Sequence, residues 1–141
     1  MTHIKRVYSD PSPRDGVRIL VDRIWPRGIS KERACIDEWR KELAPSTRLR
    51  QWFSHDPHKW KEFRRRYRAE LRRSCQTEAL KALVVLSRKQ TITLIYSAAD
   101  EEHNQAVVLK AVLDSRRKSA TSNHNPDNRV APINPGIVQA T

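Results

Sequence analysis

The sequence predicts a single α/β domain with a small, mainly parallel sheet of three or more strands and a large helical share. Two runs, 17–21 and 91–96, predict strands, and the first is typical of a strand that helices cover on both faces. Most of the chain between these runs has apolar residues at helical spacing, and strands separated by helices favour parallel pairing with right-handed crossovers. The length of 141 residues is usual for one domain.

The first third of the chain predicts two strands. Residues 4–8 form a short candidate strand, and a polar loop with a turn signal at Asp15-Gly16 follows it. The second strand, 17–21, ends where Pro26 cannot donate a ladder hydrogen bond and Gly28 permits a sharp change of direction. The first strand could pair in parallel fashion within the sheet, or antiparallel to the second strand through the connecting loop.

Four helices are predicted between the strong strands. The first begins after Ser30 and is halted by Pro45, and a short second helix begins at Ser46. The third begins at Asp56-Pro57, a capping residue followed by proline at the first helical position, and the fourth spans about 77–88. The apolar positions that support the first helix are Ile36, Trp39 and Leu43, and those of the third are Trp60, Phe63, Tyr67 and Leu71.

The strand 91–96 is followed by a last helix, for which Asp100 is the candidate N-cap. From residue 116 onward the composition changes to Ser, Thr, Asn, Pro and Arg without any aromatic residue. Such a segment cannot bury enough apolar surface to offset the entropy of ordering it. The prediction is therefore a domain over 1–115 and a disordered, polar and basic tail over 116–141.

Composition excludes several classes of protein. No apolar run approaches the roughly 20 residues of a membrane-spanning helix, and the N-terminus does not resemble a secretory signal, so we expect a cytoplasmic protein. Cys35 and Cys75 have no CxxC spacing, which predicts reduced, partly buried thiols. The domain contains only Gly16 and Gly28, too few for a P-loop or a dinucleotide fingerprint, and no cofactor is indicated.

Polar residues follow the two strong strands. Ligands of open α/β sheets bind outside the carboxyl ends of the strands, and if these two strands are parallel neighbours, the groups that follow them meet. The candidate residues are Asp22, Arg23, Trp25 and Arg27 after the first strand, and Asp100, His103 and Asn104 after the second.

These residue types suit the binding of an anion. Arg23 and Arg27 can fork onto a phosphate or carboxylate, and helix N-termini at Ser46 and Asp100 can donate backbone N–H groups. His103, near carboxylates such as Asp22, is a candidate for proton transfer near neutral pH.

A structural interpretation stands beside the functional one. Asp22 and Arg23 can form an ion pair without any chemistry, and His103 with Asn104 can satisfy backbone groups in the first helical turn. The sequence leaves open whether the protein is an enzyme.

Ser46 and His55 complete the predicted binding residues, although each also has a structural interpretation. His55 directly precedes a helix cap, and Ser46 lacks the surrounding glycines of a serine hydrolase. A metal site built from Asp22, Asp100, His103 and His55 matches no known ligand spacing, so no metal is predicted.

The strongly basic segment 57–73 supports an alternative function, that of a nucleic-acid-binding or regulatory module. The net charge of +12 favours contact with polyanions. The aromatic residues of this helix lie on the opposite stripe, where they are poorly placed to stack on bases. Glu62 and Arg66 can pair at i,i+4, and a solvated basic face is the simpler interpretation.

Three blocks of sequence, 16–28, 43–55 and 93–104, resemble the YeaO-like family of bacterial proteins (domain of unknown function 488). The resemblance covers about residues 3–114 and leaves out the tail. It implies a compact cytosolic α/β domain with no established substrate. The matching motif positions include the polar candidates above, together with Pro26, Gly28, Ser46 and His55, and none of them departs from the family pattern. The leading hypothesis is a pocket for an anionic small molecule, such as a phosphate-bearing metabolite or a nucleotide.

Overall fold

Four parallel strands form the centre of the protein, whose computed structural model describes residues 1–123 and the side chains of residues 1–118. The strand order is β1 (Thr2–Arg6), β4 (Ile92–Tyr96), β2 (Val17–Leu20) and β3 (Glu38–Trp39). The predicted parallel α/β fold is confirmed. β1 pairs with β4 in parallel register and has no ladder with β2, so the antiparallel alternative does not occur.

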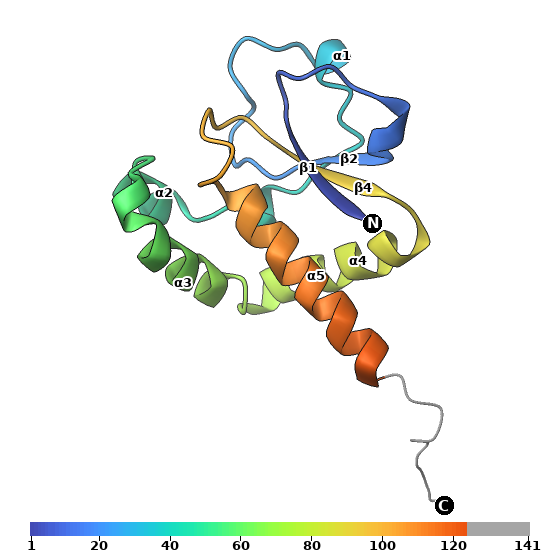
Figure 1. Cartoon of the computed structure of the whole chain (residues 1–141). Coiled ribbons are helices and arrows are strands. Elements are labelled where there is room, and N and C mark those ends of the chain that lie inside the picture. The colour runs from blue at the N-terminus through green and yellow to red at the C-terminus, as the bar shows by residue number, and fades with distance from the viewer. Residues whose placement is uncertain (124–141) are drawn as a thin grey trace, which may run out of the picture.

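Helices α4 (Ser74–Lys89) and α5 (Gln105–Asn123) cover one face of the sheet (Figure 1). The main apolar core lies between them and the strands. The other face is covered by the chain between β2 and β3, which includes the short helix α1 (Lys31–Ala34). Trp25 of this segment and Trp39 of β3 pack against a second apolar cluster there. Both faces of β4 are therefore buried.

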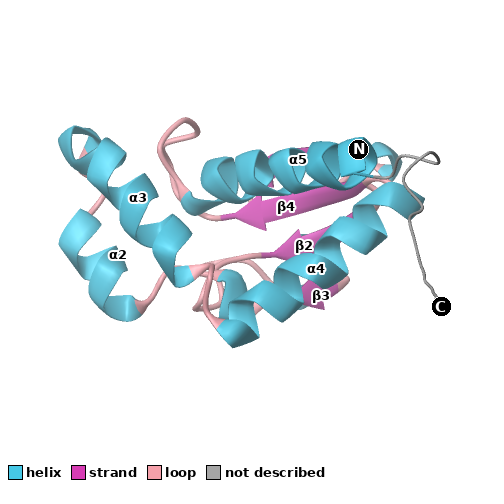
Figure 2. Cartoon of the chain, turned by 90° about the horizontal axis from the view of Figure 1, so that it is seen from below, coloured by secondary structure: helices cyan, strands magenta, loops and turns pink. Residues whose placement is uncertain are grey.

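The remaining helices, α2 (Thr47–Phe53) and α3 (Trp60–Glu70), lie beyond the ends to which the strand arrows point (Figure 2). Ser46 is the N-cap of α2, as predicted, and its Oγ accepts a hydrogen bond from the backbone N–H of Leu49 at 3.1 Å. Asp56 begins a 3-10 turn over Pro57–Lys59 that leads directly into α3. This arrangement brings the start of α2 close to the carboxyl ends of the strands.

The predicted helix over 30–44 is wrong. The chain forms α1, then β3, and then a 3-10 turn over Lys41–Leu43. Cys35 ends α1 because it adopts a left-handed conformation (φ 51°), and the buried Arg18 guanidinium donates hydrogen bonds to the carbonyls of Ala34 and Cys35. The helical spacing of Trp39 and its apolar neighbours therefore reflects a strand pairing with β2.

The start of the last helix also differs from the prediction. Asn104, rather than Asp100, caps α5, since its Oδ1 accepts hydrogen bonds from the backbone N–H groups of Ala106 and Val107 at 2.9 and 3.2 Å. Asp100 instead caps the preceding turn by accepting from the backbone N–H groups of Glu102 and His103. The tail boundary expected at residue 116 falls within α5, and the rest of the expected tail, 124–141, lies outside the described residues.

Both cysteines are exposed, which corrects the expectation of partly buried thiols. Within residues 1–123, no helix is long and apolar enough to cross a membrane.

Candidate functional site

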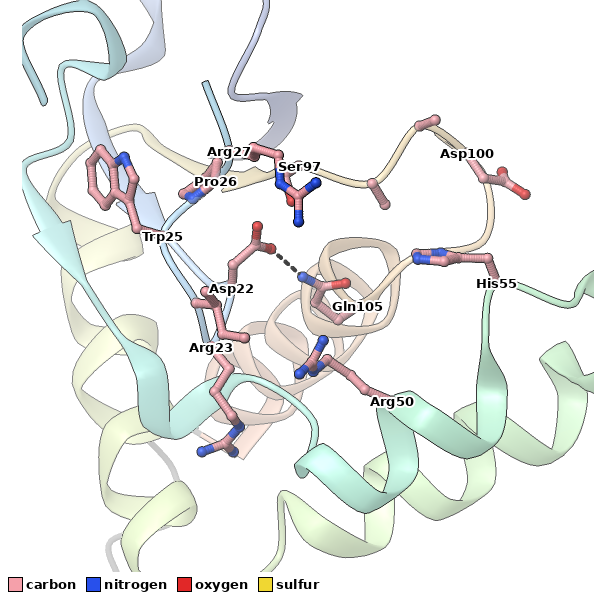
Figure 3. Close-up of a pocket in the computed structure, with 13 residues that line it drawn as sticks. Asp22, Arg23, Trp25, Pro26, Arg27, Arg50, His55, Ser97, Asp100 and Gln105 are labelled. Carbon is pink, nitrogen blue, oxygen red and sulfur yellow. Dashed lines mark hydrogen bonds between the residues drawn. The ribbon is translucent and has the colours of Figure 1, made fainter. Parts of the chain in front are cut away.

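A cavity of about 520 Å³ opens at the carboxyl ends of β2 and β4 (Figure 3). It lies there because the two strands are parallel neighbours, with Leu20 opposite Ile95, so the segments that follow them leave the sheet side by side. Three parts of the chain line it: residues 22–27 after β2, residues 97–100 after β4, and the side chains of Arg50, His55 and Gln105. Of the residues predicted to meet there, Asp22, Arg27 and Asp100 line this cavity, whereas His103 and Asn104 do not.

Asp22 is the buried acidic group of the cavity. Its Oδ1 accepts a 2.5 Å hydrogen bond from Nε2 of Gln105, and its backbone carbonyl accepts from the indole N–H of Trp39 at 2.7 Å. Burial raises the pKa of Asp22, although hydrogen bonds from Ser97 and Gln105 and the positive charge of Arg50 oppose that rise. Asp22 therefore holds a proton more readily than an exposed carboxylate does.

Arg27 and Arg50 bring positive charge to the cavity from opposite sides of the Asp22–Gln105 pair (Figure 3). Both residues are exposed. In the described part of the chain, neither guanidinium has a hydrogen-bond or ion-pair partner. Each therefore keeps its full set of N–H donors for a ligand.

Arg23 lines the wall of the cavity, but its guanidinium points away from it (Figure 3). Nε donates to the carbonyl of Pro45 at 3.1 Å and Nη2 donates to that of Ala44 at 3.2 Å. Among the described residues it forms no ion pair with Asp22. Arg23 ties the segment before α2 to the end of β2, which is a structural role.

Trp25 also turns away from the cavity in Figure 3. Its indole N–H donates to the carbonyl of Ile29 at 2.8 Å, and its ring meets Trp39 edge-on with 5.5 Å between centroids. Trp25 therefore packs on the second face of the sheet.

His103 faces a separate, smaller cavity of about 70 Å³. Its Nδ1 lies 2.9 Å from Oδ2 of Asp100, and its ring meets Trp60 edge-on at 5.2 Å. Hydrogen bonds from the backbone of Glu102 and from His103 lower the pKa of Asp100 below its ordinary value. Asp100 lines the main cavity, whereas His103 and Asn104 line only the smaller one.

His55 lines both cavities and has an unusual backbone. Ser54 and His55 are consecutive residues with positive φ, 46° and 57°, a conformation that is uncommon for residues other than glycine. The Ser54 conformation ends α2, and the following turn aims the His55 imidazole into the main cavity (Figure 3).

Ser46 lines neither cavity. Its hydroxyl donates a hydrogen bond to Glu70 at 2.6 Å. Sequence reasoning missed Arg50 and Gln105. Gln105 was missed because the last helix was expected to begin at Asp100, whereas it begins after Asn104. Arg50 lies one turn into α2, after the predicted cap Ser46. Within the described residues, no group of three or more His, Cys, Asp and Glu side chains is placed to hold a metal ion.

Comparison with known proteins identifies relatives but no characterised activity. The family model described as "Inactive DUF488-N3 subclade" matches residues 1–131. The uncharacterized protein YeaO of Escherichia coli (strain K12) is 47% identical over 105 residues, which cover 74% of this chain and 90% of YeaO. Uncharacterized proteins Mb3100c of Mycobacterium bovis and Rv3073c of Mycobacterium tuberculosis are each 40% identical over 113 residues, 80% of this chain and 93% of theirs. No solved structure matches the chain.

Proposed function

The chain belongs to the YeaO-like DUF488 family, and we propose that its main cavity binds a small anionic molecule that carries a phosphate or carboxylate group. The observation that carries the proposal is that Arg27 and Arg50 lie on either side of one cavity and that neither guanidinium has a hydrogen-bond or ion-pair partner among the described residues. Arginine binds phosphates and carboxylates through two parallel N–H donors, so two arginines can hold one anionic group from both sides.

The size and charge of the cavity support this proposal. A volume of about 520 Å³ lies within the roughly 300–1,000 Å³ of small-molecule sites. Asp22 is the buried one of the two acidic residues that line the cavity, and its raised pKa favours the uncharged form, which does not repel an incoming anion. In its protonated form, Asp22 can donate a hydrogen bond to the ligand.

The arrangement supports binding more than acid–base catalysis. Asp22 and His103, the candidates for proton transfer, line two adjoining cavities, and neither cavity is lined by both of them. Each side chain also already has a hydrogen-bond partner, Gln105 for Asp22 and Asp100 for His103. The description of the matching subclade as inactive agrees with a binding role.

The test is a thermal-shift screen with phosphate-bearing metabolites, nucleotides and inorganic phosphate. A ligand that stabilises the wild-type protein should lose most of its effect in Arg27→Ala and Arg50→Ala. Loss of one charge-assisted hydrogen-bonding group weakens binding by about tenfold or more. Both variants should melt like the wild type without ligand, because both side chains are exposed.

Arg48→Ala is the matched control, since Arg48 is an exposed arginine of α2 that does not line the cavity. It should keep the ligand response. The proposal fails if no compound shifts the melting temperature, or if Arg48→Ala removes the response as fully as Arg50→Ala does.

A further inference from the structure

The basic face of α3 consists of two parts with different electrostatics. On one side, Glu62 accepts hydrogen bonds from Arg65 at 2.6 and 2.9 Å and from Arg66 at 2.9 Å. These hydrogen bonds lower the pKa of Glu62 to about 2, so the carboxylate is ionised at neutral pH. Arg65 and Arg66 therefore share a counter-charge within their own helix.

On the other side, Arg64, Arg68 and Arg72 have no carboxylate partner within the part of the chain that the structure describes. In the described part of the chain, none of the three takes part in a hydrogen bond or ion pair through its guanidinium, and Arg64 lies over the ring of Trp60 at 5.8 Å. Arg64 and Arg68 lie four residues apart on α3, about 6 Å along the helix axis, and Arg72 lies two residues beyond Glu70, the last residue of the helix. Together they form a row of cations.

This row continues into a cleft of about 170 Å³ that a second helix completes. Arg116 of α5 lines the cleft opposite Arg68 and Arg72, and the buried side chains of Leu71 and Val112 contribute to its lining. We call the group of Arg68, Arg72 and Arg116 the arginine cleft.

The arginine cleft gathers three positive charges that repel one another. Arg116 has no partner in the described residues, and the acidic group nearest to it in α5, Asp114, is bound to Lys110 at 2.7 Å. Arg68 and Arg116 are half-buried, so water screens them less than fully exposed cations. An anion in the cleft relieves this repulsion.

We propose that the arginine cleft, extended by Arg64, binds the phosphate backbone of a nucleic acid. A row of cations on a helix suits a row of phosphates, whereas one free phosphate occupies only one or two of the arginines. The cleft volume is below the roughly 300 Å³ at which small-molecule sites begin, so it suits phosphate groups more than a whole nucleotide.

Contact with the backbone alone also agrees with the aromatic residues of α3. Phe63 and Tyr67 are buried in the core and cannot stack on bases. Binding should therefore show little dependence on base sequence. The arginine cleft shares no residue with the cavity of the proposed function, so each proposal can fail without the other.

The experiment measures the binding of the full chain to short labelled single-stranded and duplex oligonucleotides by fluorescence anisotropy over a series of salt concentrations. The wild type should bind at low salt and weaken steeply as salt rises. Arg68→Gln combined with Arg116→Gln should weaken binding about tenfold or more. The double variant should also reduce the slope of log K against log salt by roughly 0.7–0.9 for each phosphate that it no longer neutralises.

The matched control is Arg65→Gln combined with Arg66→Gln, which removes the same charge from the paired side of α3. It should change affinity only slightly. Arg72→Gln alone, at an exposed position, supplies a variant that folds even if the half-buried substitutions do not, and it too should lower affinity and slope.

Three outcomes would overturn the proposal. The first is absence of oligonucleotide binding at low salt, and the second is equal weakening by the control pair. The third is a preference for another anion, seen as displacement by low concentrations of inorganic phosphate or as binding to phosphatidylglycerol vesicles without binding to oligonucleotides.

Discussion

The side chain of Gln105, the first residue of α5, donates a 2.5 Å hydrogen bond to Asp22, which lies two residues beyond the end of β2. This hydrogen bond joins the segments that follow the two central strands across the floor of the main cavity. It also fixes the one buried carboxyl group there, whose burial raises its pKa. The charge of the cavity therefore depends on the protonation of Asp22.

Anion binding should accordingly depend on pH through Asp22. As pH rises through the raised pKa of this group, its carboxylate ionises and repels the ligand, so affinity should fall. Asp22→Asn keeps a hydrogen-bonding side chain but cannot ionise, and its affinity should stay constant over the same range. Calorimetric titration with sulfate, whose own charge is constant there, measures the effect.

Gln105→Ala supplies a second check on the same relationship. The Gln105 amide stabilises the ionised form of Asp22, so its loss should raise the pKa of Asp22 further and move the fall in affinity to higher pH. A pH-independent affinity in the wild type, or an unchanged pH profile in Asp22→Asn, would contradict the assignment.

The folding stability of the protein should respond to Asp22 in a definite direction. Because the pKa of Asp22 is raised in the folded state, the protonated side chain favours folding and the ionised one opposes it. The free energy of unfolding should therefore decline as pH rises from the ordinary pKa of 3.8 through the raised value. Asp22→Asn should therefore equal or exceed the wild type in stability at neutral pH. Urea denaturation at several pH values measures the difference.

An opposite pH dependence should come from Asp15, whose side chain holds the buried Arg18 at 2.6 Å and Lys5 at 2.9 Å. Burial alone would raise the pKa of Asp15, but hydrogen bonds from Lys5, the backbone of Ser12 and Arg18 outweigh it and lower the pKa. The resulting stabilisation is present above pH 3.8 and should be lost as pH falls through the lowered pKa.

Asp15→Asn should cost about 3 kcal/mol at neutral pH, because it leaves the Arg18 guanidinium buried without a counter-charge. Asp10→Asn is the control, since Asp10 is exposed and only its backbone carbonyl contacts Lys5. Chemical denaturation measures the free energy of unfolding of both variants. Equal values would contradict a stabilising Asp15–Arg18 ion pair.

The two glycines of the domain allow a matched comparison of backbone strain. Both have positive φ, 65° for Gly16 and 77° for Gly28. A Cβ at Gly16 would lie 2.1 Å from the carbonyl oxygen of Thr91, whereas a Cβ at Gly28 would meet nothing within 4 Å. Gly28→Ala should cost about 1–2 kcal/mol from its conformation alone.

Gly16→Ala should cost clearly more than Gly28→Ala, because the approach of β2 to Thr91 must widen as well. Its backbone N–H and that of Val17 both lie in hydrogen bonds at this turn, so the shift disturbs the start of the β2–β4 pairing. Thermal melting of the two variants gives the ranking. A larger loss in Gly28→Ala would contradict the close approach seen at Thr91.

The parts of the fold with strong local signals were predicted from the sequence. β2 and β4 were recognised from their apolar runs, and α2 from its cap, Ser46. The error over 30–44 arose because the decisive contacts are distant in sequence: Arg18 binds the carbonyls that end α1, and Trp39 joins the sheet beside Leu20. Apolar spacing alone cannot distinguish that arrangement from a helix.

The sequence pointed to the carboxyl ends of the central strands, but it could not predict the directions of the individual side chains. Parallel pairing of β2 with β4 explains why Asp22, Arg27 and Asp100 line one cavity. The direction of Arg23 could not be predicted, because the carbonyls that it contacts at Ala44 and Pro45 come near only after the chain has folded. Arg50 was missed because the cavity that it lines exists only once α2 lies beside the ends of β2 and β4.

Two residues near the start of α5, Asp100 and Asn104, accept hydrogen bonds from backbone N–H groups, and only Asn104 caps the helix. Asn104 is buried, its Oδ1 accepts from two backbone N–H groups of α5, and its Nδ2 donates to the carbonyl of Asp100 at 2.9 Å. Asn104→Ala should therefore destabilise the protein by about 1–2 kcal/mol, at the upper end of the usual range for caps. Asp100→Ala should cost less, since it removes the hydrogen bonds of the turn before α5 and the contact with His103 but leaves the cap of the helix in place. Urea denaturation of the two variants ranks them, and a greater loss in Asp100→Ala would mean that the last helix begins at the earlier residue. Because Gln105 directly follows the cap, Asn104→Ala should also loosen the hydrogen bond that Gln105 donates to Asp22. The pH dependence of sulfate binding should then change in Asn104→Ala and should stay as in the wild type in Asp100→Ala.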